Sequence, residues 1–444
     1  MSLKRNKRSL YLLLLFIFIL QLCGCNGYTD VEDLLVAPKS QKIEEKEFVD
    51  KLFFLPEGAK IIKDADESFK SIVEIDYNND KNTDYIVLYR MKDNRYNYFI
   101  SIFTNSNGII EKTHTITGYG KKIKNFIVED LNNDNIPEIL IGSSAGAYIK
   151  NGLSVYYYNN NNYDEIFTDA YSELIIDDLD GDLLKEVFLM NFYDNKSSKA
   201  EIYRFNKEKF SFIDDATFEM DTKRILDIKV GLAAPYKKGI FVDLQVGTDA
   251  SYTDLFILEN DYLVNVFYEY EKKMTTKTFR PTIWVSKDID NDGIVEIPLI
   301  LNQSKIDEIY NILWVRWNEL IDIEDWKFEV QCIKLNMVLD VPKEDGEILD
   351  FKMNYEDSKS GINIIYSNPY TGKQIVISKI LMLTKSQWEK IKSIDISEEY
   401  VFLYETPMHV YVLNVNNELN NYKLSKYQNH IFIKKHMHII KGGL

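Results

Sequence analysis

The sequence predicts an all-β fold of repeated four-stranded sheets, arranged as a β-propeller of about seven blades, with six or eight as the alternatives. Two observations support this prediction. Short apolar runs rich in β-branched residues recur along the 444 residues without a sustained helical period. An acidic segment of nine residues recurs between pairs of these runs. Apolar runs on both sides of a turn are typical of β-hairpins.

The acidic segments set the period of the repeat. Their starts are separated by 54, 48 and 110 residues, and the last interval spans two periods. A copy that has lost most of its acids is therefore expected in the gap, where residues 224–247 keep the flanking apolar runs. The four clear copies are DYNNDKNTD at 76–84 (loop 1), DLNNDNIPE at 130–138 (loop 2), DLDGDLLKE at 178–186 (loop 3) and DIDNDGIVE at 288–296 (loop 4).

Each unit continues with two further strand-like runs after its hairpin, for example LSVYYY at 153–158 and YDEIFTD at 163–169. Two weaker units are expected at 347–380 and 400–415. Ring closure requires that no strand edge stays unpaired, because free edges invite aggregation. Residues 54–63 are therefore expected to start or close the ring.

The amino terminus is predicted to be a targeting segment rather than part of the fold. Four basic residues precede an apolar run at 10–20, which is shorter than the roughly 20 residues of a membrane-spanning helix. The LCGC that follows resembles the lipobox of bacterial lipoproteins, with Leu22, Gly24 and the acceptor Cys25. The resemblance implies cleavage before Cys25 and a diacylglyceryl group on its sulfur, which anchors the protein to the membrane on the extracytoplasmic side. An ordinary signal peptide with a chance cysteine is the alternative.

Three parts follow from this interpretation: a lipoprotein signal peptide at 1–24, a lipidated cysteine and polar tether at 25–44, and the propeller at 45–444. After cleavage only Cys25 and Cys332 remain. Because Cys25 carries the lipid, no intrachain disulfide is expected.

The charge of the chain limits its partners. The net charge is −16, and the segment 1–24 holds four basic residues and no acidic ones, so its removal leaves a still more acidic protein. Such a surface repels nucleic acid and anionic headgroups, and it suits cations or partners with basic patches. No nucleic-acid partner is expected.

The acidic loops resemble the D-x-[DN]-x-[DN]-G-x-x-[DE] loops of FG-GAP and VCBS repeat proteins, which include the propeller of integrin α subunits. The resemblance implies that each loop joins the first two strands of a blade and holds a structural Ca²⁺. Side chains at positions one, three, five and nine and a carbonyl at position seven would supply oxygens, the ligands that Ca²⁺ prefers. The implied ligands are Asp288, Asp290, Asp292 and Glu296; Asp178, Asp180, Asp182 and Glu186; Asp130, Asn132, Asp134 and Glu138; and Asp76, Asn78, Asp80 and Asp84.

Loop 4 matches this pattern best, because Gly293 occupies the sixth position, where the turn is sharpest. Leu183, Asn135 and Lys81 stand there in loops 3, 2 and 1, and leucine and lysine put the turn geometry in doubt. The alternative interpretation is that all four loops are turns whose Asp and Asn side chains cap their own backbone without an ion.

Two other motifs contain residue types that occur in catalytic or metal sites. GSSAG at 142–146 fits the nucleophile-elbow pattern around Ser144, but a strand-like run follows where that elbow requires a helix. We therefore interpret it as an inter-strand loop. His436 and His438 are expected on one face of a carboxy-terminal strand, with no acidic or cysteine partner close in sequence.

The sequence shows no P-loop, no dinucleotide fingerprint and no recognisable pair of catalytic carboxylates, so it does not predict an enzyme. The function predicted is a lipid-anchored, extracytoplasmic module that binds or scaffolds a protein or polysaccharide of the cell envelope. The alternative is a surface hydrolase or lyase that acts on envelope glycans or peptides.

Overall fold

A computed structural model describes residues 55–63, 68–78, 80–144, 151–159, 161–192, 198–206, 209–218, 222–346, 348–355, 359–368, 370–394, 399–415 and 424–440. The expected signal peptide, Cys25 and the tether lie outside these residues. None of the helices described is long and apolar enough to span a membrane. The described residues are mostly strands and form six antiparallel sheets of four or five strands and one two-stranded ribbon.

The first four sheets are meanders in which strands adjacent in sequence pair with each other. In sheet I, both β1 and β2 pair with β3. Sheet I contains β1 (Ala59–Ile61), β2 (Ile72–Ile75), β3 (Asp84–Met91), β4 (Asn97–Ser106) and β5 (Ile109–Tyr119); sheet II contains β6 (Lys122–Glu129), β7 (Glu138–Ser144), β8 (Asn151–Asn159) and β9 (Asn162–Tyr171). Sheet III contains β10 (Glu173–Asp177), β11 (Glu186–Asn191), β12 (Ser198–Asn206) and β13 (Lys209–Phe218); sheet IV contains β14 (Thr222–Ala234), β15 (Lys237–Val246), β16 (Ala250–Glu259) and β17 (Tyr262–Asn265).

The last two sheets each gain a strand from further along the chain. Sheet V contains β20 (Ile297–Ser304), β21 (Ile309–Asn318), β22 (Asp322–Cys332), β23 (Met337–Val341) and β29 (Met437–Ile439); sheet VI contains β24 (Leu349–Asn354), β25 (Ser360–Ser367), β26 (Gln374–Thr384), β28 (His409–Val415) and β27 (Tyr400–Glu405). The ribbon is β18 (Tyr268–Glu269) with β19 (Met274–Thr275), and the short helices are η1 (Ile333–Leu335), α4 (Lys343–Gly346), α5 (Lys385–Lys392), η4 (Ser425–Gln428) and α6 (His430–His436).

Consecutive sheets pack face to face, and apolar side chains fill each seam between them. In β11, Val187 and Leu189 pack toward sheet II, whereas Phe188 and Met190 pack toward sheet IV. This follows from the alternation of side chains along a strand. The same arrangement recurs from the seam between sheets I and II to the seam between sheets V and VI. The runs that look uniformly apolar in sequence are therefore central strands buried on both faces.

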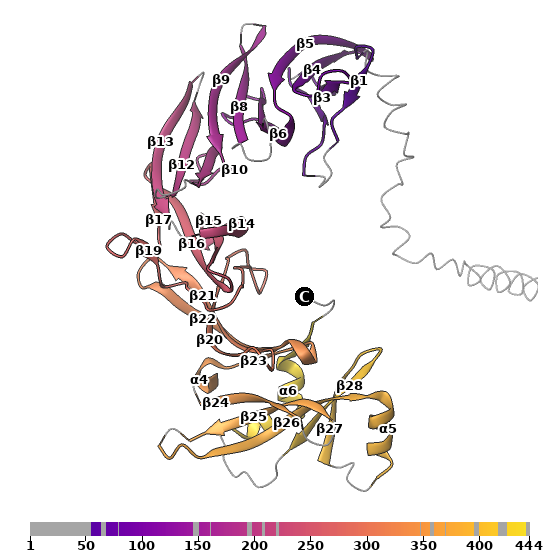
Figure 1. Ribbon diagram of the computed structural model, residues 1–444, viewed down its shortest axis with the longest axis vertical. Coiled ribbons are helices and arrows are strands. Elements are labelled where there is room, and N and C mark those ends of the chain that lie inside the picture. Colours follow the sequence, from indigo (N-terminus) through magenta and orange to yellow (C-terminus); the bar gives the residue numbers. More distant parts are fainter. Residues whose placement is uncertain are drawn as a thin grey trace, which may run out of the picture.

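The sheets follow an open arc, with sheet I and sheet VI at opposite ends (Figure 1). This corrects the expectation of a closed ring, whereas the six sheets of the described residues agree with the lower of the two alternatives to about seven blades. The expected units at 347–380 and 400–415 join into sheet VI through the pairing of β26 with β28. The strand at 59–61 pairs within sheet I, and β29 pairs with β23 of sheet V. Both terminal strands are thus paired locally, and neither closes a ring.

Sheet V also lacks the first strand expected at 283–286. Only a single bridge, between Lys287 and Glu296, occupies that place. The preceding segment is held instead by Arg280, which is fully buried and donates to Asp243 of β15 at 2.8 Å. The unit at 224–247 forms the expected hairpin of β14 and β15, without an acidic loop.

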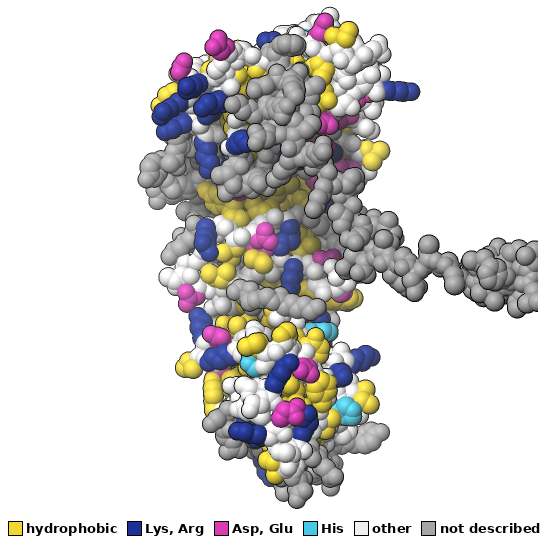
Figure 2. All heavy atoms as spheres, turned by 90° about the vertical axis from the view of Figure 1, so that its right-hand side faces the viewer, with side chains coloured by type: hydrophobic (Ala, Val, Ile, Leu, Met, Phe, Trp, Pro, Cys, Tyr) yellow, Lys and Arg dark blue, Asp and Glu magenta, His cyan; other side chains and the backbone are white. Residues whose placement is uncertain are grey.

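Ion pairs between neighbouring sheets add to the seams. Lys124 of sheet II lies 2.9 Å from Glu173 of sheet III, and Lys238 of sheet IV lies 2.6 Å from Asp177 of sheet III. Figure 2 looks onto the open side of the arc, where side chains of both charges are interspersed. Partly exposed pairs of this kind contribute about 0–1 kcal/mol each, so the apolar seams hold the arc together.

Candidate cation loops and their arginine partners

The acidic loops lie where the sequence predicts, at the start of four sheets. Loop 1 joins β2 to β3 in sheet I, and loops 2 and 3 join the first two strands of sheets II and III. Loop 4 precedes β20 and is closed by the bridge between Lys287 and Glu296. The loops of sheets II and III also touch, because the backbone N–H of Lys185 donates to the carbonyl of Leu131 at 2.9 Å. The backbone of loop 4 likewise pairs with Leu232 of β14.

Within each loop the side chains first satisfy the backbone. In loop 4, the carboxylate of Asp288 accepts the N–H groups of Asn291 at 2.7 Å and Gly293 at 2.9 Å, and Asp292 accepts the N–H of Ile294 at 2.9 Å. Equivalent hydrogen bonds recur in the other three loops. The Asp and Asn side chains therefore cap the backbone of their own loop, as the alternative interpretation predicts. These hydrogen bonds do not determine what the remaining carboxylate oxygens bind.

The sixth position is left-handed in every loop. Gly293 has φ 90°, Leu183 has 73°, Asn135 has 67° and Lys81 has 69°. The doubt raised by leucine and lysine is thus resolved, because the first-position aspartate accepts the N–H of the sixth residue and holds it in this conformation. For a non-glycine residue the left-handed conformation costs about 1–2 kcal/mol, which the loop hydrogen bonds must offset.

The ninth-position acids fasten the loops to the sheets. Asp84, Glu138, Glu186 and Glu296 are all fully buried. Each accepts the backbone N–H of the second residue of its loop. Burial raises the pKa of all four carboxyl groups, since it disfavours the charged form.

Loops 3 and 4 gather three carboxylates around an arginine. In loop 4, Nη2 of Arg316 lies 3.2 Å from Asp290 and 2.9 Å from Asp292, and its guanidinium also donates to Glu296. In loop 3, Arg204 binds Glu186 at 2.7 Å and Asp180 at 2.6 Å. A different choice of three acids in each loop, Asp288, Asp290 and Glu296 in loop 4 and Asp178, Asp180 and Glu186 in loop 3, brings one carboxylate oxygen from each within 4.8 Å of the others, a spacing that suits a metal ion.

Sequence reasoning missed these arginines, although a signal was present. Both lie in the strand-like run that follows the hairpin of their unit, EIYRF and ILWVRW. Arg204 stands directly opposite Glu186 in the pairing of β11 with β12. A basic residue that pairs directly with the ninth-position glutamate across the hairpin is therefore the sequence signal for a positive charge within the loop.

Loops 1 and 2 have no such arginine, and they differ from each other. In loop 1, both carboxylate oxygens of Asp84 accept backbone N–H groups, from Tyr77 at 3.3 Å and from Asn105 at 2.8 Å. In loop 2, Oε2 of Glu138 accepts the N–H of Leu131 at 2.9 Å, but Oε1 is buried without a hydrogen-bond partner. Burial raises the pKa of Glu138 to about 8.

The candidate cation sites differ in how their negative charge is neutralised. Loop 4 matches the sequence pattern best, yet the positive charge among its acids is supplied by Arg316. A divalent cation beside a guanidinium also meets repulsion of about 1 kcal/mol or more per unit charge at 4 Å. Loop 2 offers only oxygen donors, its acids form no ion pair with any lysine or arginine described, and one buried carboxylate oxygen is unsatisfied. Among the described residues, however, the acids that converge within 4.8 Å are those of loops 3 and 4, so loop 2 is distinguished by its unsatisfied oxygen and not by the spacing of its acids.

A surface pocket of about 450 Å³ adjoins loop 4. Its wall includes Trp326, whose indole N–H donates to Asp290 at 3.0 Å and whose ring centre lies 3.5 Å from the guanidinium carbon of Arg316. The ring is 45% exposed. The arginine and the acidic loop thus also fix an aromatic side chain at the surface.

The motifs considered for catalysis or metal binding do not form such sites in the described residues. Ser144 is buried at the end of β7, and its side chain has no histidine or carboxylate partner there. His436 ends α6 while His438 lies in β29, 3.1 Å from Asp340, so the expectation that they share a strand face is wrong. Cys332 is a buried free thiol whose pKa burial raises to about 11.

No protein-family model and no curated protein matches the chain. Among solved structures, the exotype rhamnogalacturonan lyase YesX is 8% identical with a TM-score of 0.29, and the match covers 79% of this chain and 90% of that one. Rhamnogalacturonan lyase YesW is 9% identical with a TM-score of 0.29 over 84% and 96% of the two chains. A protein from Lactobacillus plantarum is 8% identical with a TM-score of 0.28 over 64% and 91%. Similarities this weak assign neither a fold nor an activity.

Proposed function

We propose that this protein is a lipid-anchored, extracytoplasmic binding module of the cell envelope, whose sheets correspond to blades of the FG-GAP and VCBS type and are stabilised by Ca²⁺. The observation that carries the proposal is the unsatisfied buried oxygen of Glu138 in a loop of oxygen donors. Extracellular Ca²⁺ modules bind at about 10⁻⁴ to 10⁻³ M. A site of that strength fills only outside the cytoplasm, which agrees with the lipidation of Cys25 that the lipobox implies.

In this proposal the ion is structural. Asp130, Asn132, Asp134 and Glu138 would hold it, and it would supply positive charge that neutralises the loop. The buried carboxyl of Glu138 would lose its proton on binding, because its oxygen becomes a ligand. Since Leu131 accepts a hydrogen bond from Lys185 of loop 3, the ion would also stiffen the seam between sheets II and III.

The ligand of the module would be a protein or polysaccharide of the envelope, bound on the surface that the successive sheets present. The alternative, a surface hydrolase or lyase acting on glycans or peptides, gains no support from the described residues. The pocket beside loop 4 holds an arginine already engaged by three acids, and Ser144 has no base next to it. We therefore favour binding over catalysis.

Three experiments test this function. Incorporation of labelled palmitate into the wild type, and its loss in Cys25→Ala, tests the anchor; protease treatment of intact cells tests the location. Pull-down of envelope polysaccharide and protein fractions by the wild-type protein tests binding. Turnover of envelope glycans without stable binding would instead support the enzymatic alternative.

A further inference from the structure

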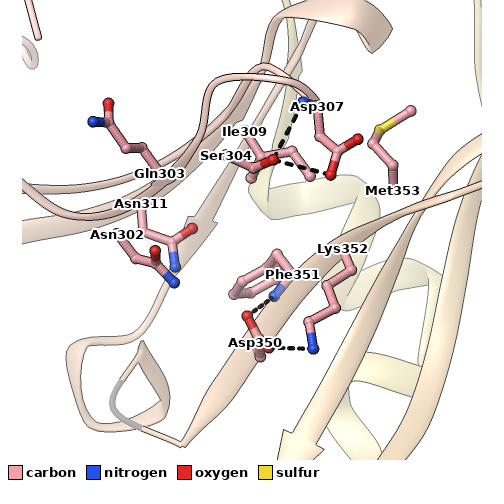
Figure 3. Close-up of a pocket in the computed structure, with 10 residues that line it drawn as sticks. All are labelled: Asn302, Gln303, Ser304, Asp307, Ile309, Asn311, Asp350, Phe351, Lys352 and Met353. Carbon is pink, nitrogen blue, oxygen red and sulfur yellow. Dashed lines mark hydrogen bonds and ion pairs between the residues drawn. The ribbon is translucent and has the colours of Figure 1, made fainter.

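A pocket of about 380 Å³ opens between sheets V and VI, where β20 and β21 face β24 (Figure 3). Its volume lies within the range of about 300–1,000 Å³ typical of small-molecule sites. It is separate from the acidic loops, and it offers the proposed binding module a defined site.

The pocket contains a buried asparagine whose amide has no partner among the described residues. Asn311 of β21 is 8% exposed, and its side chain forms no hydrogen bond with any described residue. Figure 3 shows this amide pointing across the pocket toward Phe351. Although the residue is buried, its amide atoms are not among the fully buried atoms that lack a partner, so solvent in the pocket reaches them. Asn311 is well placed to hydrogen-bond a ligand.

A β-bulge places a second amide beside it. Ile300 pairs with Ile312, but Asn302 pairs with Asn311, because the register shifts at Leu301. In a regular strand Asn302 would share the face of Ile300. The bulge turns it instead to the face of Asn311, and in Figure 3 both amides point toward Phe351. Bulges often re-aim a side chain in this way next to functional sites.

The charges around the pocket are already balanced. Lys352 lies 3.2 Å from Asp350. Asp307 accepts hydrogen bonds from Ser304 at 3.0 Å and from the hydroxyl of Tyr355. What remains for a ligand is a pair of amides, which both donate and accept, and the small part of Phe351 that lines the pocket, since this side chain is 5% exposed and otherwise packs in the core. The matching ligand is uncharged, carries several hydroxyl groups and presents an apolar C–H face.

We propose that this pocket binds a neutral sugar residue of an envelope polysaccharide, with hydroxyl groups on Asn302 and Asn311 and the C–H face toward Phe351. The inference rests on the proposed binding function and names its ligand class. A peptide that joins a sheet binds mainly through the backbone of a free strand edge. The bulge interrupts the ladder here, and the groups on offer are side-chain amides, so a sugar fits better than a peptide.

Calorimetric titration of the full chain tests the proposal. The probes are neutral maltooligosaccharides, cellooligosaccharides and laminarin oligosaccharides, with oligogalacturonate as a charged control and oligoalanine as a peptide control. We expect at least one neutral oligosaccharide to bind, and Asn311→Ala to weaken it about tenfold or more, since a hydrogen bond contributes about 1 kcal/mol and a buried amide binds through more than one. Asn318→Ala, at the other end of β21, should bind as the wild type does.

Melting temperature separates a ligand role from a structural one. Asn311→Val should melt at or above the wild-type temperature, because it places a β-branched side chain in β21, and it should not bind the oligosaccharide. The proposal is overturned if no neutral probe binds at millimolar concentration, if Asn311→Ala binds unchanged, or if only oligogalacturonate or oligoalanine binds. If the wild type and Asn311→Ala retain equal amounts of envelope polysaccharide, the pocket is not the binding site, but the proposed binding function stands. A wild type that retains no envelope fraction overturns the proposed function itself.

Discussion

Arg316 lies 2.9 Å from Asp292, inside the loop whose sequence is the best match to a Ca²⁺ site. The guanidinium also contacts Asp290 and Glu296. A side chain thus supplies the positive charge that the acidic spacing indicated. Arg204 does the same in loop 3. The four loops share the same backbone hydrogen bonds. An arginine neutralises the acids of loops 3 and 4, whereas no arginine described does so in loops 1 and 2.

Removing Arg316 should make loop 4 dependent on calcium. Arg316→Gln leaves Glu296 buried beside Asp290 and Asp292 without a counter-charge, and losing one partner of a buried pair costs about 3–5 kcal/mol. We expect a loss of that size in urea unfolding with chelator, partly recovered by millimolar Ca²⁺. Arg95→Gln, an exposed control, should change little. An Arg316→Gln variant with wild-type stability in chelator would show that the arginine does not neutralise the loop.

Glu138 should make stability depend on pH in the absence of calcium. Its pKa rises from the ordinary 4.5 to about 8 in the folded protein, so the native state binds the extra proton. The free energy of unfolding should therefore fall as pH rises from about 4.5 toward 8. Glu138→Gln mimics the protonated form, and the wild-type profile minus the variant profile should isolate this slope. Identical pH profiles for the wild type and Glu138→Gln would show that another group binds the extra proton.

The same group should couple calcium to protons. Below pH 8, binding of Ca²⁺ to loop 2 must displace the proton of Glu138, so affinity should increase with pH until the pKa is passed. Titrations in buffers of different ionisation enthalpy measure the protons released. A release near zero at pH 7 would contradict a Glu138 ligand.

The buried pair of Asp243 and Arg280 should be essential to sheet IV and to the segment that leads into loop 4. Both side chains are fully buried, 2.8 Å apart. Asp243→Ala leaves a buried guanidinium unpaired and should cost about 3–5 kcal/mol in chemical unfolding. Asp243→Leu combined with Arg280→Met should lose less than the two single changes together. Additive losses would mean that the pair does not act as a unit.

Gly142 should prove structural rather than part of a nucleophile elbow. A Cβ added there would lie 1.8 Å from the hydroxyl oxygen of Tyr171, which donates to Asn125. Gly142→Ala should therefore lower the unfolding free energy by about 1–3 kcal/mol through overpacking. Ser144→Ala should leave envelope binding unchanged. A loss of any measured hydrolysis in Ser144→Ala, with normal stability, would revive the catalytic interpretation.

The repeat, the hairpins and the acidic loops could be predicted because they depend on local patterns. Alternating apolar side chains and nine-residue acidic turns fix a hairpin whatever surrounds it, and even Leu183 adopts the left-handed turn that its neighbours impose. The count of sheets and the open arc could not be predicted. They depend on which edge β28 and β29 pair with, a choice between distant strands that no local pattern encodes.

The arginine partners and the unsatisfied oxygen could not be predicted for a related reason. Arg316 reaches loop 4 from the next strand of the sheet, and Glu138 is distinguished only by the burial of one oxygen. Neither feature belongs to the nine-residue motif. The motif predicts which oxygen atoms are present in the loop, whereas the packing of the sheets determines which of them already have a hydrogen-bond or ion-pair partner.

Calorimetric titration of Ca²⁺ into the wild type, Glu138→Gln and Asp288→Asn tests the central claim most directly. We predict a millimolar to submillimolar site in the wild type that Glu138→Gln abolishes and Asp288→Asn retains. A site that survives in Glu138→Gln and disappears in Asp288→Asn would contradict the account and return the ion to loop 4.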